Sequence, residues 1–293
     1  MSLIEEALKR AKRDAAQAEP ARPRPVANTH VASGDAPVVS GRLAARLAAR
    51  PQIDLDREFL RRSGLAPLAS AERRMTSEYR AIKRGLLASM SRRTAASEGK
   101  SVMVASAMPG EGKTFTSLNL ALSLAAERDW TVVLIDADSA KQHLSSVFDM
   151  RDQRGLLDVL SDPSLSLVDV AFRTSVPGLN FVSAGQAPEA STELMASARM
   201  SGVLEQLFRE DPRTIVVFDS SPLLLTTDSR ALADAVDQVM LVVRADSTPR
   251  ASVTEAIAAL GEDHQVGLVL NEYQGTALQQ EYYAEHSGPR AAS

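Results

Sequence analysis

The chain has 293 residues, of which 44% are hydrophobic and 4% aromatic, and its 33 basic and 37 acidic side chains give a formal net charge of −4. This balance gives no sign of bulk nucleic-acid binding, and the absence of cysteine excludes disulfides and thiolate metal sites. No apolar run approaches the roughly 18 residues that cross a bilayer, and the mixed-charge N-terminus is not a secretory signal, so we expect a cytoplasmic protein.

The N-terminal region is expected to contain one helix and a long linker. Residues 1–17 predict a short amphipathic helix with Leu3, Ile4 and Leu8 on one side, either a frayed terminal helix or a docking helix for a partner. Residues 18–69 are rich in Pro, Ala and Arg, so we expect a largely disordered linker with at most a brief helix at "GRLAARLAAR".

Residues 70–276 are expected to form one folded domain, which opens with a helix. Met75, Tyr79, Ile82 and Leu86 recur at spacings of three and four residues over 70–92, as on one face of a helix. Its basic edge, which includes Lys83, is interpreted as a solvated face, with an interface as the alternative.

From residue 100 onward, apolar runs alternate with helical stretches. The runs are continuous rather than alternating, as expected for parallel strands that are covered on both faces. This pattern predicts an α/β fold with a doubly wound, mostly parallel sheet. The expected strands are "SVMVASA", "TVVLIDAD", "LNFVSAG", "TIVVFDSS", "QVMLVVRAD" and "VGLVLNEY", and the helices between them include 114–127, 191–209, 227–235 and 249–260.

A phosphate-binding loop is predicted at "AMPGEGKT", residues 107–114, between a strand and a helix. It matches G-x-x-x-x-G-K-[ST] with Ala107 at the first glycine position. Backbone N–H groups and the helix N-terminus would face the phosphates, Lys113 would reach the β- and γ-phosphates, and the Thr114 hydroxyl would ligate Mg²⁺. We assign nucleotide binding to Gly110, Glu111, Gly112, Lys113, Thr114, Phe115 and Asn271, and ATP and Mg²⁺ as cofactors.

Three carboxylates follow predicted strands. Asp136 and Asp138 end "VVLIDAD" at i and i+2, so both point to the same side, and Asp219 ends "TIVVFD". In this fold the carboxyl ends of the strands face the ligand crevice. We assign catalysis to Lys113, Asp136 and Asp138, and the metal to Thr114, Asp136 and Asp219.

The last predicted strand and the tail supply the remaining candidates. Asn271 closes "VGLVLN", where its amide would read the adenine edge unless it is only a turn residue. Residues 277–293 are expected to be a flexible tail. Tyr282 and Tyr283 lie there, where a mobile tyrosine can enter a neighbouring active site, and we interpret them as phosphoacceptors, with incidental tail composition as the alternative.

Together these motifs resemble the bacterial tyrosine kinases (BY-kinases) of exopolysaccharide export. The resemblance rests on "MPGEGKT", "VVLIDAD", "IVVFDSSPLL" and the terminal tyrosine pair. "MSLIEEALKRA", "EYRAIKRGLL" and "STELMASARM" look like the exosortase-associated tyrosine autokinases within that family. The family pattern departs at Ser221, where D-x-P-P enzymes have the first proline.

The resemblance implies a fold, an activity and partners. The fold is a P-loop NTPase with deviant Walker motifs, similar to MinD and ParA. Asp136 and Asp138 would form the Walker A′ motif, one or the other would help to activate the acceptor tyrosine, and Asp219 would support Mg²⁺ as Walker B. Tyr282 and Tyr283 would be phosphorylated in trans within a homo-oligomer. The partner would be the cytoplasmic tail of a membrane chain-length-determinant protein (a polysaccharide co-polymerase), which would recruit the kinase to the inner membrane.

Two other functions stay open. A MinD/ParA-like ATPase switch shares the fold, although its signature lysine, five residues before the phosphate-loop lysine, is Met108 here. A nucleotide-binding scaffold of the export complex would use the nucleotide only to lock the fold. The intact Lys113, Asp136 and Asp219 argue against the scaffold.

Overall fold

The computed structural model describes residues 42–90, 100–127, 129–186 and 190–273. All of them belong to one compact unit that begins at Gly41. The predicted N-terminal helix at 1–17, the linker up to residue 41 and the tail at 277–293 lie outside the described residues. No helix of the described part is long and apolar enough to cross a membrane.

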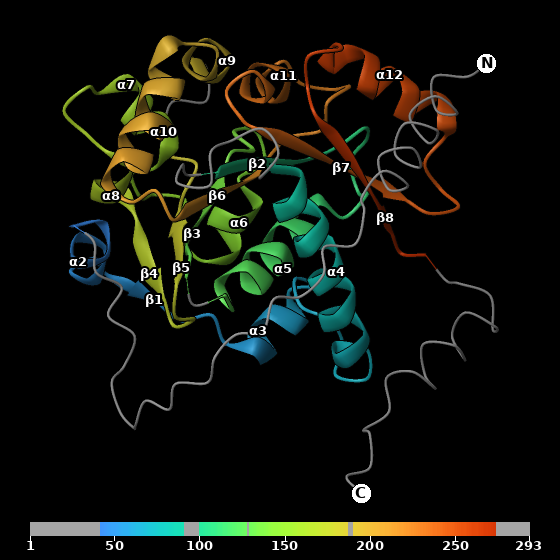
Figure 1. Cartoon of the computed structure of the whole chain (residues 1–293), viewed down its shortest axis with the longest axis horizontal. Coiled ribbons are helices and arrows are strands. Elements are labelled where there is room, and N and C mark those ends of the chain that lie inside the picture. Colours follow the sequence, from blue (N-terminus) through green and yellow to red (C-terminus); the bar gives the residue numbers. More distant parts are fainter. Residues whose placement is uncertain (1–41, 91–99, 128, 187–189, 274–293) are drawn as a thin grey trace, which may run out of the picture. The chain divides into compact units, whose positions relative to one another are not determined.

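An eight-stranded sheet forms the centre of the unit (Figure 1). Its order is β1-β4-β5-β3-β6-β2-β7-β8, and every neighbouring pair is parallel except β4 with β5. The six strands predicted from apolar runs are all present, which confirms the α/β fold class. The strands are β1 (Gln52–Ile53), β2 (Lys100–Ser106), β3 (Thr131–Asp136), β4 (Phe172–Thr174), β5 (Leu179–Val182), β6 (Thr214–Asp219), β7 (Gln238–Arg244) and β8 (Val266–Asn271).

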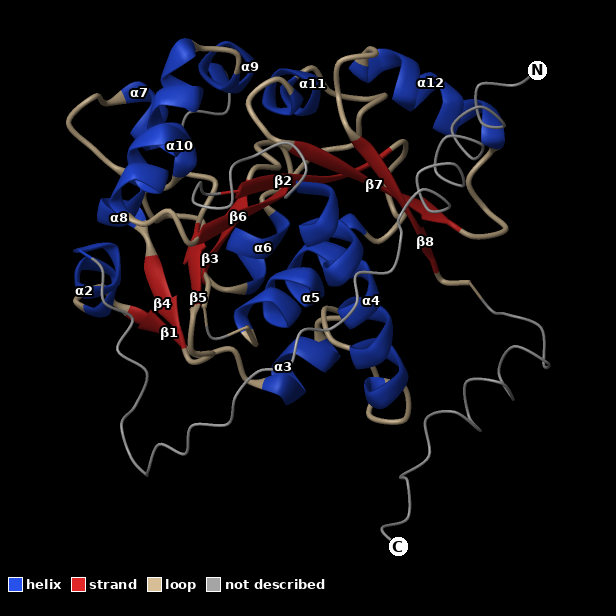
Figure 2. Ribbon diagram, viewed as in Figure 1, coloured by secondary structure: helices blue, strands red, loops and turns tan. Residues whose placement is uncertain are grey.

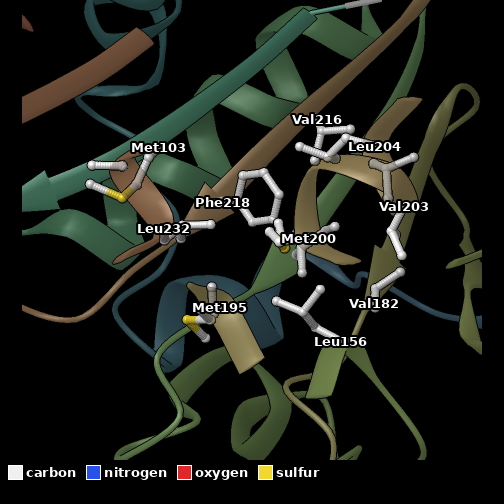
Figure 3. Packing of buried hydrophobic residues seen from close by; sticks show 14 of the residues in the cluster. Met103, Leu156, Val182, Met195, Met200, Val203, Leu204, Val216, Phe218 and Leu232 are labelled. Atoms are coloured by element: carbon white, nitrogen blue, oxygen red, sulfur yellow. The ribbon is translucent and has the colours of Figure 1, made fainter. Parts of the chain in front are cut away.

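Helices cover both faces of this sheet (Figure 2). On one face α3, α4, α5 and α6 enclose a core around Leu118, Leu134 and Val217. On the other face α2 and α7 to α12 enclose a second core, in which Figure 3 shows Phe218 of β6 beside Met200 of α10. The helices are α2 (Arg42–Ala48), α3 (Arg57–Arg62), α4 (Glu72–Met90), α5 (Lys113–Ala125), α6 (His143–Val147), α7 (Leu156–Ser161), α8 (Leu167–Val170), α9 (Ser191–Met195), α10 (Ala198–Glu210), α11 (Asp228–Ala233) and α12 (Arg250–Leu260).

The brief helix expected within residues 41–50 is present as α2, whereas the prediction of a disordered linker was wrong for residues 51–69. Leu43 and Leu47 of α2 are buried in the core, and β1 adds to the sheet beside β4. Arg46 pairs with Glu210 of α10 at 2.7 Å, which fastens α2 to the domain. The overall composition of the segment obscured a few leucines such as Leu43, Leu47 and Leu60, whose burial stabilises α2 and α3 against the sheet.

Two details of the predicted helices also change. The stretch 191–209 is broken, because Ser197 is extended (φ −75°, ψ 152°) and precedes a new helix, as serine does at helix N-termini. On α4, Lys83 is not on a solvated face: it is 6% exposed, and its Nζ donates to the carbonyl of Ser123 at 3.0 Å and pairs with Glu127.

The outer strand β8 is less well covered than the other long strands. Leu268 and Leu270 are 54% and 55% exposed, while the strands β2, β3 and β6 are buried throughout. Most of the predicted site residues lie at the carboxyl ends of β2, β3 and β6, and only Asn271, at the carboxyl end of β8, comes from this outer strand.

Candidate functional site

The phosphate loop connects β2 to α5 as predicted. Gly110 and Gly112 have φ values of +81° and +93°, a conformation that side chains with a Cβ rarely adopt. Ala107 has no positive φ, so its position does not require the glycine of the usual pattern. The Thr116 N–H donates to the Gly112 carbonyl at 2.9 Å and closes the first helical turn. The N–H groups of residues 113–115 precede this bond and are therefore available to an anion.

Lys113 and Asp219 lie close to each other beneath this loop. Lys113 is the first residue of α5 and is 8% exposed, and its positive charge offsets part of the rise that burial causes in the pKa of Asp219. Ser117, one turn further along α5, donates its hydroxyl to Asp219 Oδ1 at 3.0 Å. The helix thus presents Lys113 and Ser117 on the face that meets the end of β6.

Burial dominates the electrostatics of Asp219. Burial, and after it the neighbouring charge of Asp136, raise the pKa of this carboxyl, while Lys113 and the hydroxyls of Thr114 and Ser117 lower it, and the net result is a pKa of about 7. Asp219 Oδ2 is buried and has no hydrogen-bond partner among the described residues. A buried carboxylate oxygen without a partner is costly unless a cation or donor arrives.

Asp136 is the register partner of Asp219 on the adjacent strand β3. It is fully buried, and burial raises its pKa to about 6, although bonds from Ser145 and from the Asp138 N–H lower it. The Ser145 N–H and hydroxyl donate to Asp136 Oδ2 at 2.8 and 2.7 Å. Ser145, on α6, therefore fixes the orientation of this carboxyl.

Asp138 follows in the loop after β3 and is 5% exposed. Its Oδ1 accepts the Lys141 N–H at 3.1 Å and the Ser221 hydroxyl at 2.9 Å. Ser221 is the residue at which the sequence departs from the D-x-P-P pattern. The departure therefore places a hydrogen-bond donor against the second aspartate of the motif.

The remaining predicted nucleotide ligands have other contacts in the structure. The Phe115 ring lies against Tyr79 of α4, with centroids 6.5 Å apart, so its side chain packs into the core face. The Asn271 amide donates to the Glu111 carbonyl at 2.9 Å and lies against Gly112, beside the phosphate loop. Tyr282 and Tyr283 lie outside the described residues.

Sequence reasoning missed four hydroxyls that orient the site: Ser117, Ser145, Ser221 and Thr248. Ser117 had a signal, because it is four residues after Lys113 on a predicted helix and therefore on the same face. Thr248, before α12, donates its hydroxyl to Glu111 Oε1. No local pattern links Thr248 to the site, because its contact with Glu111 joins distant parts of the chain, and the turn between β3 and α6 that brings Ser145 to Asp136 has no signal in the sequence.

The described residues fit a divalent cation bound together with a nucleotide. No cluster of three or more His, Cys, Asp or Glu that would hold a metal alone occurs among them. The partnerless Asp219 Oδ2, with Asp136 and Thr114 beside it, is the arrangement of hard oxygen atoms that Mg²⁺ accepts when phosphates complete its coordination. Thr114, Asp219 and Asp136 are the residues that would hold it.

Comparison with known proteins places the chain in a nucleotide-binding family. The family described as "CobQ/CobB/MinD/ParA nucleotide binding domain" matches residues 102–290. The tyrosine-protein kinase YwqD of Bacillus subtilis is 30% identical over 199 residues, which cover 67% of this chain and 80% of YwqD. The putative tyrosine-protein kinase EpsB of Ralstonia nicotianae is 34% identical over 159 residues, 54% of this chain. This chain spans only about a fifth of EpsB, since the match covers 21% of its length.

Solved structures agree with these matches. The kinase domain of the Escherichia coli tyrosine kinase ETK has a TM-score of 0.59 and 26% identity, over 69% of this chain and 78% of that one. The VpsO kinase domain has a TM-score of 0.56 and 31% identity, over 71% of this chain and all of that one. The chain belongs to the CobQ/CobB/MinD/ParA nucleotide-binding family and, within it, to the bacterial tyrosine kinases.

Proposed function

We propose that the chain is an ATP-dependent protein-tyrosine autokinase that phosphorylates Tyr282 and Tyr283 of a second copy. The observation that supports this most is the convergence of Lys113, Asp136 and Asp219 at the carboxyl ends of three adjacent strands. All three residues lie within residues 102–290, which match the nucleotide-binding family, and the relatives named tyrosine-protein kinases support the choice of reaction.

Each side chain has a distinct part in the reaction. The loop N–H groups and Lys113 bind and orient the phosphates of ATP and neutralise charge on the transferring group. A tyrosine oxygen attacks the γ-phosphorus, the bond from that phosphorus to the ADP oxygen breaks, and the phenol proton passes to a carboxylate. Asp138 is better placed than Asp136 to accept this proton, because Asp136 has no exposed surface and its Oδ2 already accepts two hydrogen bonds from Ser145. Bound Mg²⁺ would supply further charge neutralisation at the phosphates.

The biological role that we propose is the regulation of exopolysaccharide polymerisation or export. The resemblance to exosortase-associated autokinases and the match to EpsB support it. The activator would be the cytoplasmic tail of a membrane polysaccharide co-polymerase, which would bring a homo-oligomer of the cytoplasmic kinase to the inner membrane.

Phosphopeptide mass spectrometry on the full chain with Mg·ATP tests the proposal. We expect phosphate on Tyr282 or Tyr283, its loss in Lys113→Ala, and an increase when the partner's cytoplasmic tail is added. Tyr282→Phe with Tyr283→Phe is the matched control, because it removes the acceptors and leaves the nucleotide site intact.

Other outcomes would identify the alternatives. ATP consumption without phosphotyrosine, with and without the partner, would contradict the kinase and favour the ATPase switch. A Lys113→Ala strain with full polysaccharide output would favour the scaffold.

A further inference from the structure

Glu111 occupies a position that the phosphate-loop pattern leaves open to any residue. In this structure it is only 3% exposed, and three segments of the chain bind it. Its Oε2 accepts the Met108 N–H at 2.8 Å within the loop, and its Oε1 accepts the Thr248 hydroxyl. Its carbonyl accepts the Asn271 amide at 2.9 Å. We call Glu111, Thr248 and Asn271 the loop latch.

The loop latch fixes the orientation of one peptide group. No described peptide bond is cis, so the carbonyl of Glu111 and the N–H of Gly112 point in opposite directions across their shared plane. Asn271 holds the carbonyl on its own side, where a Cβ on Gly112 would be 2.0 Å from Asn271 Nδ2. The Gly112 N–H therefore points away from Asn271, next to the free N–H groups that open α5.

The two donors of the latch are themselves anchored near the start of the tail. The Thr248 oxygen also accepts the Arg244 N–H at 3.1 Å, so both functions of the hydroxyl are used. The Arg244 side chain pairs with Glu272, the residue after Asn271, at 2.7 Å. The Tyr273 carbonyl accepts Arg74 of α4 at 3.4 Å.

We propose that Asn271 and Thr248 are positioning residues for nucleotide phosphate. They hold the Glu111–Gly112 peptide so that the Gly112 N–H joins the phosphate cradle, and Asn271 therefore acts on the phosphates rather than on the adenine edge. Phosphate affinity then depends on the segment from which the acceptor tail begins. The inference rests on nucleotide binding and not on transfer to tyrosine, so it can fail or hold independently of the kinase activity.

Calorimetric titration of the full chain with Mg·ATP and Mg·ITP tests this inference. ITP has the same sugar and phosphates as ATP and differs on the hydrogen-bonding edge of the base. We expect Asn271→Ala and Thr248→Val each to weaken the binding of both nucleotides roughly tenfold, as for the loss of a buried hydrogen bond. The ratio of the two dissociation constants should stay at the wild-type value. Thr248→Ser, which keeps the hydroxyl, should bind like wild type.

Two results would overturn the inference. If Asn271→Ala weakened ATP but not ITP, the amide would read the base. If both variants bound both nucleotides like wild type, the latch would have no part in binding.

A measurement on the wild-type protein covers the case in which the variants do not fold. The Gly112 amide should exchange its hydrogen more slowly when Mg·ADP is added. Unchanged exchange at Gly112, with slower exchange at Lys113 and Thr114, would also overturn the inference.

Discussion

Asp136 and Asp219 face each other as register partners at the ends of two adjacent parallel strands, and neither has any exposed surface. Burial raises the pKa of Asp136 to about 6 and that of Asp219 to about 7. A neighbouring carboxylate contributes to each rise, Asp138 for Asp136 and Asp136 for Asp219. In the nucleotide-free protein this pair is therefore a source of repulsion that the fold has to overcome.

The pH dependence of stability should reveal this pair. Because the folded pKa values lie above the unfolded value, the folded state holds more protons, and stability falls as pH rises from about 4 through 7. The free energy of unfolding of the wild type should fall between pH 5 and pH 8, and we expect Asp219→Asn to make this fall smaller by on the order of 2 kcal/mol. Urea unfolding at each pH, with chelator and without nucleotide, measures this free energy. Asp152→Asn, at an exposed position, is the control and should change nothing.

The two loop glycines should differ when replaced by alanine. Both have positive φ, so each alanine carries backbone strain of about 1–2 kcal/mol. A Cβ at Gly110 meets nothing within 4 Å, whereas one at Gly112 displaces the Asn271 amide. We expect Gly112→Ala to weaken Mg·ATP binding at least about tenfold more than Gly110→Ala. Equal losses in a fluorescent-nucleotide titration would mean that contact with Asn271 does not matter.

Phosphorylation in trans predicts complementation between two inactive variants. Lys113→Ala keeps the acceptor tyrosines, and the double variant Tyr282→Phe, Tyr283→Phe keeps the nucleotide site. Mixed with Mg·ATP, they should yield phosphotyrosine on the Lys113→Ala chains, in an amount that rises with total protein concentration. Activity of wild type alone, with none in the mixture, would show that each chain modifies its own tail.

The ordered segment before α4 should contribute to stability. Leu43 of α2 has no exposed surface, whereas Leu68 is 70% exposed. We expect Leu43→Ala to lower the free energy of unfolding by about 2–5 kcal/mol, because it leaves a cavity, and Leu68→Ala to change it by less than about 0.5 kcal/mol. Similar values for the two variants in denaturant titrations would show that α2 is not part of the cooperative unit.

The sequence predicted those parts of the molecule whose signals are local. Continuous apolar runs identified β2, β3 and β5 to β8, and the spacing of Gly110, Gly112 and Lys113 identified the phosphate loop. The strands β1 and β4 were not predicted, because two or three residues are too few to show the hydrophobic pattern of a strand.

The site was predicted to a similar extent. Asp136, Asp138 and Asp219 come together at one edge because parallel strands align their carboxyl ends. Ser145, Ser221 and Thr248 were missed because their contacts with these acids and with Glu111 form only after folding. Phe115 was assigned by its place in the motif, yet its ring faces Tyr79, a direction that spacing alone does not give.

The two edge strands of the sheet, β1 and β8, differ in how well they are protected against pairing with a strand from another chain. At one margin β1 is two residues long and follows Pro51, so it offers an incoming chain little backbone for pairing. At the other margin β8 is six residues long and carries the exposed Leu268 and Leu270. Charge or proline at the margin is the usual safeguard against such pairing, and residues 266–270 have neither. Strand addition from another chain, including the first step of aggregation, would therefore begin at β8.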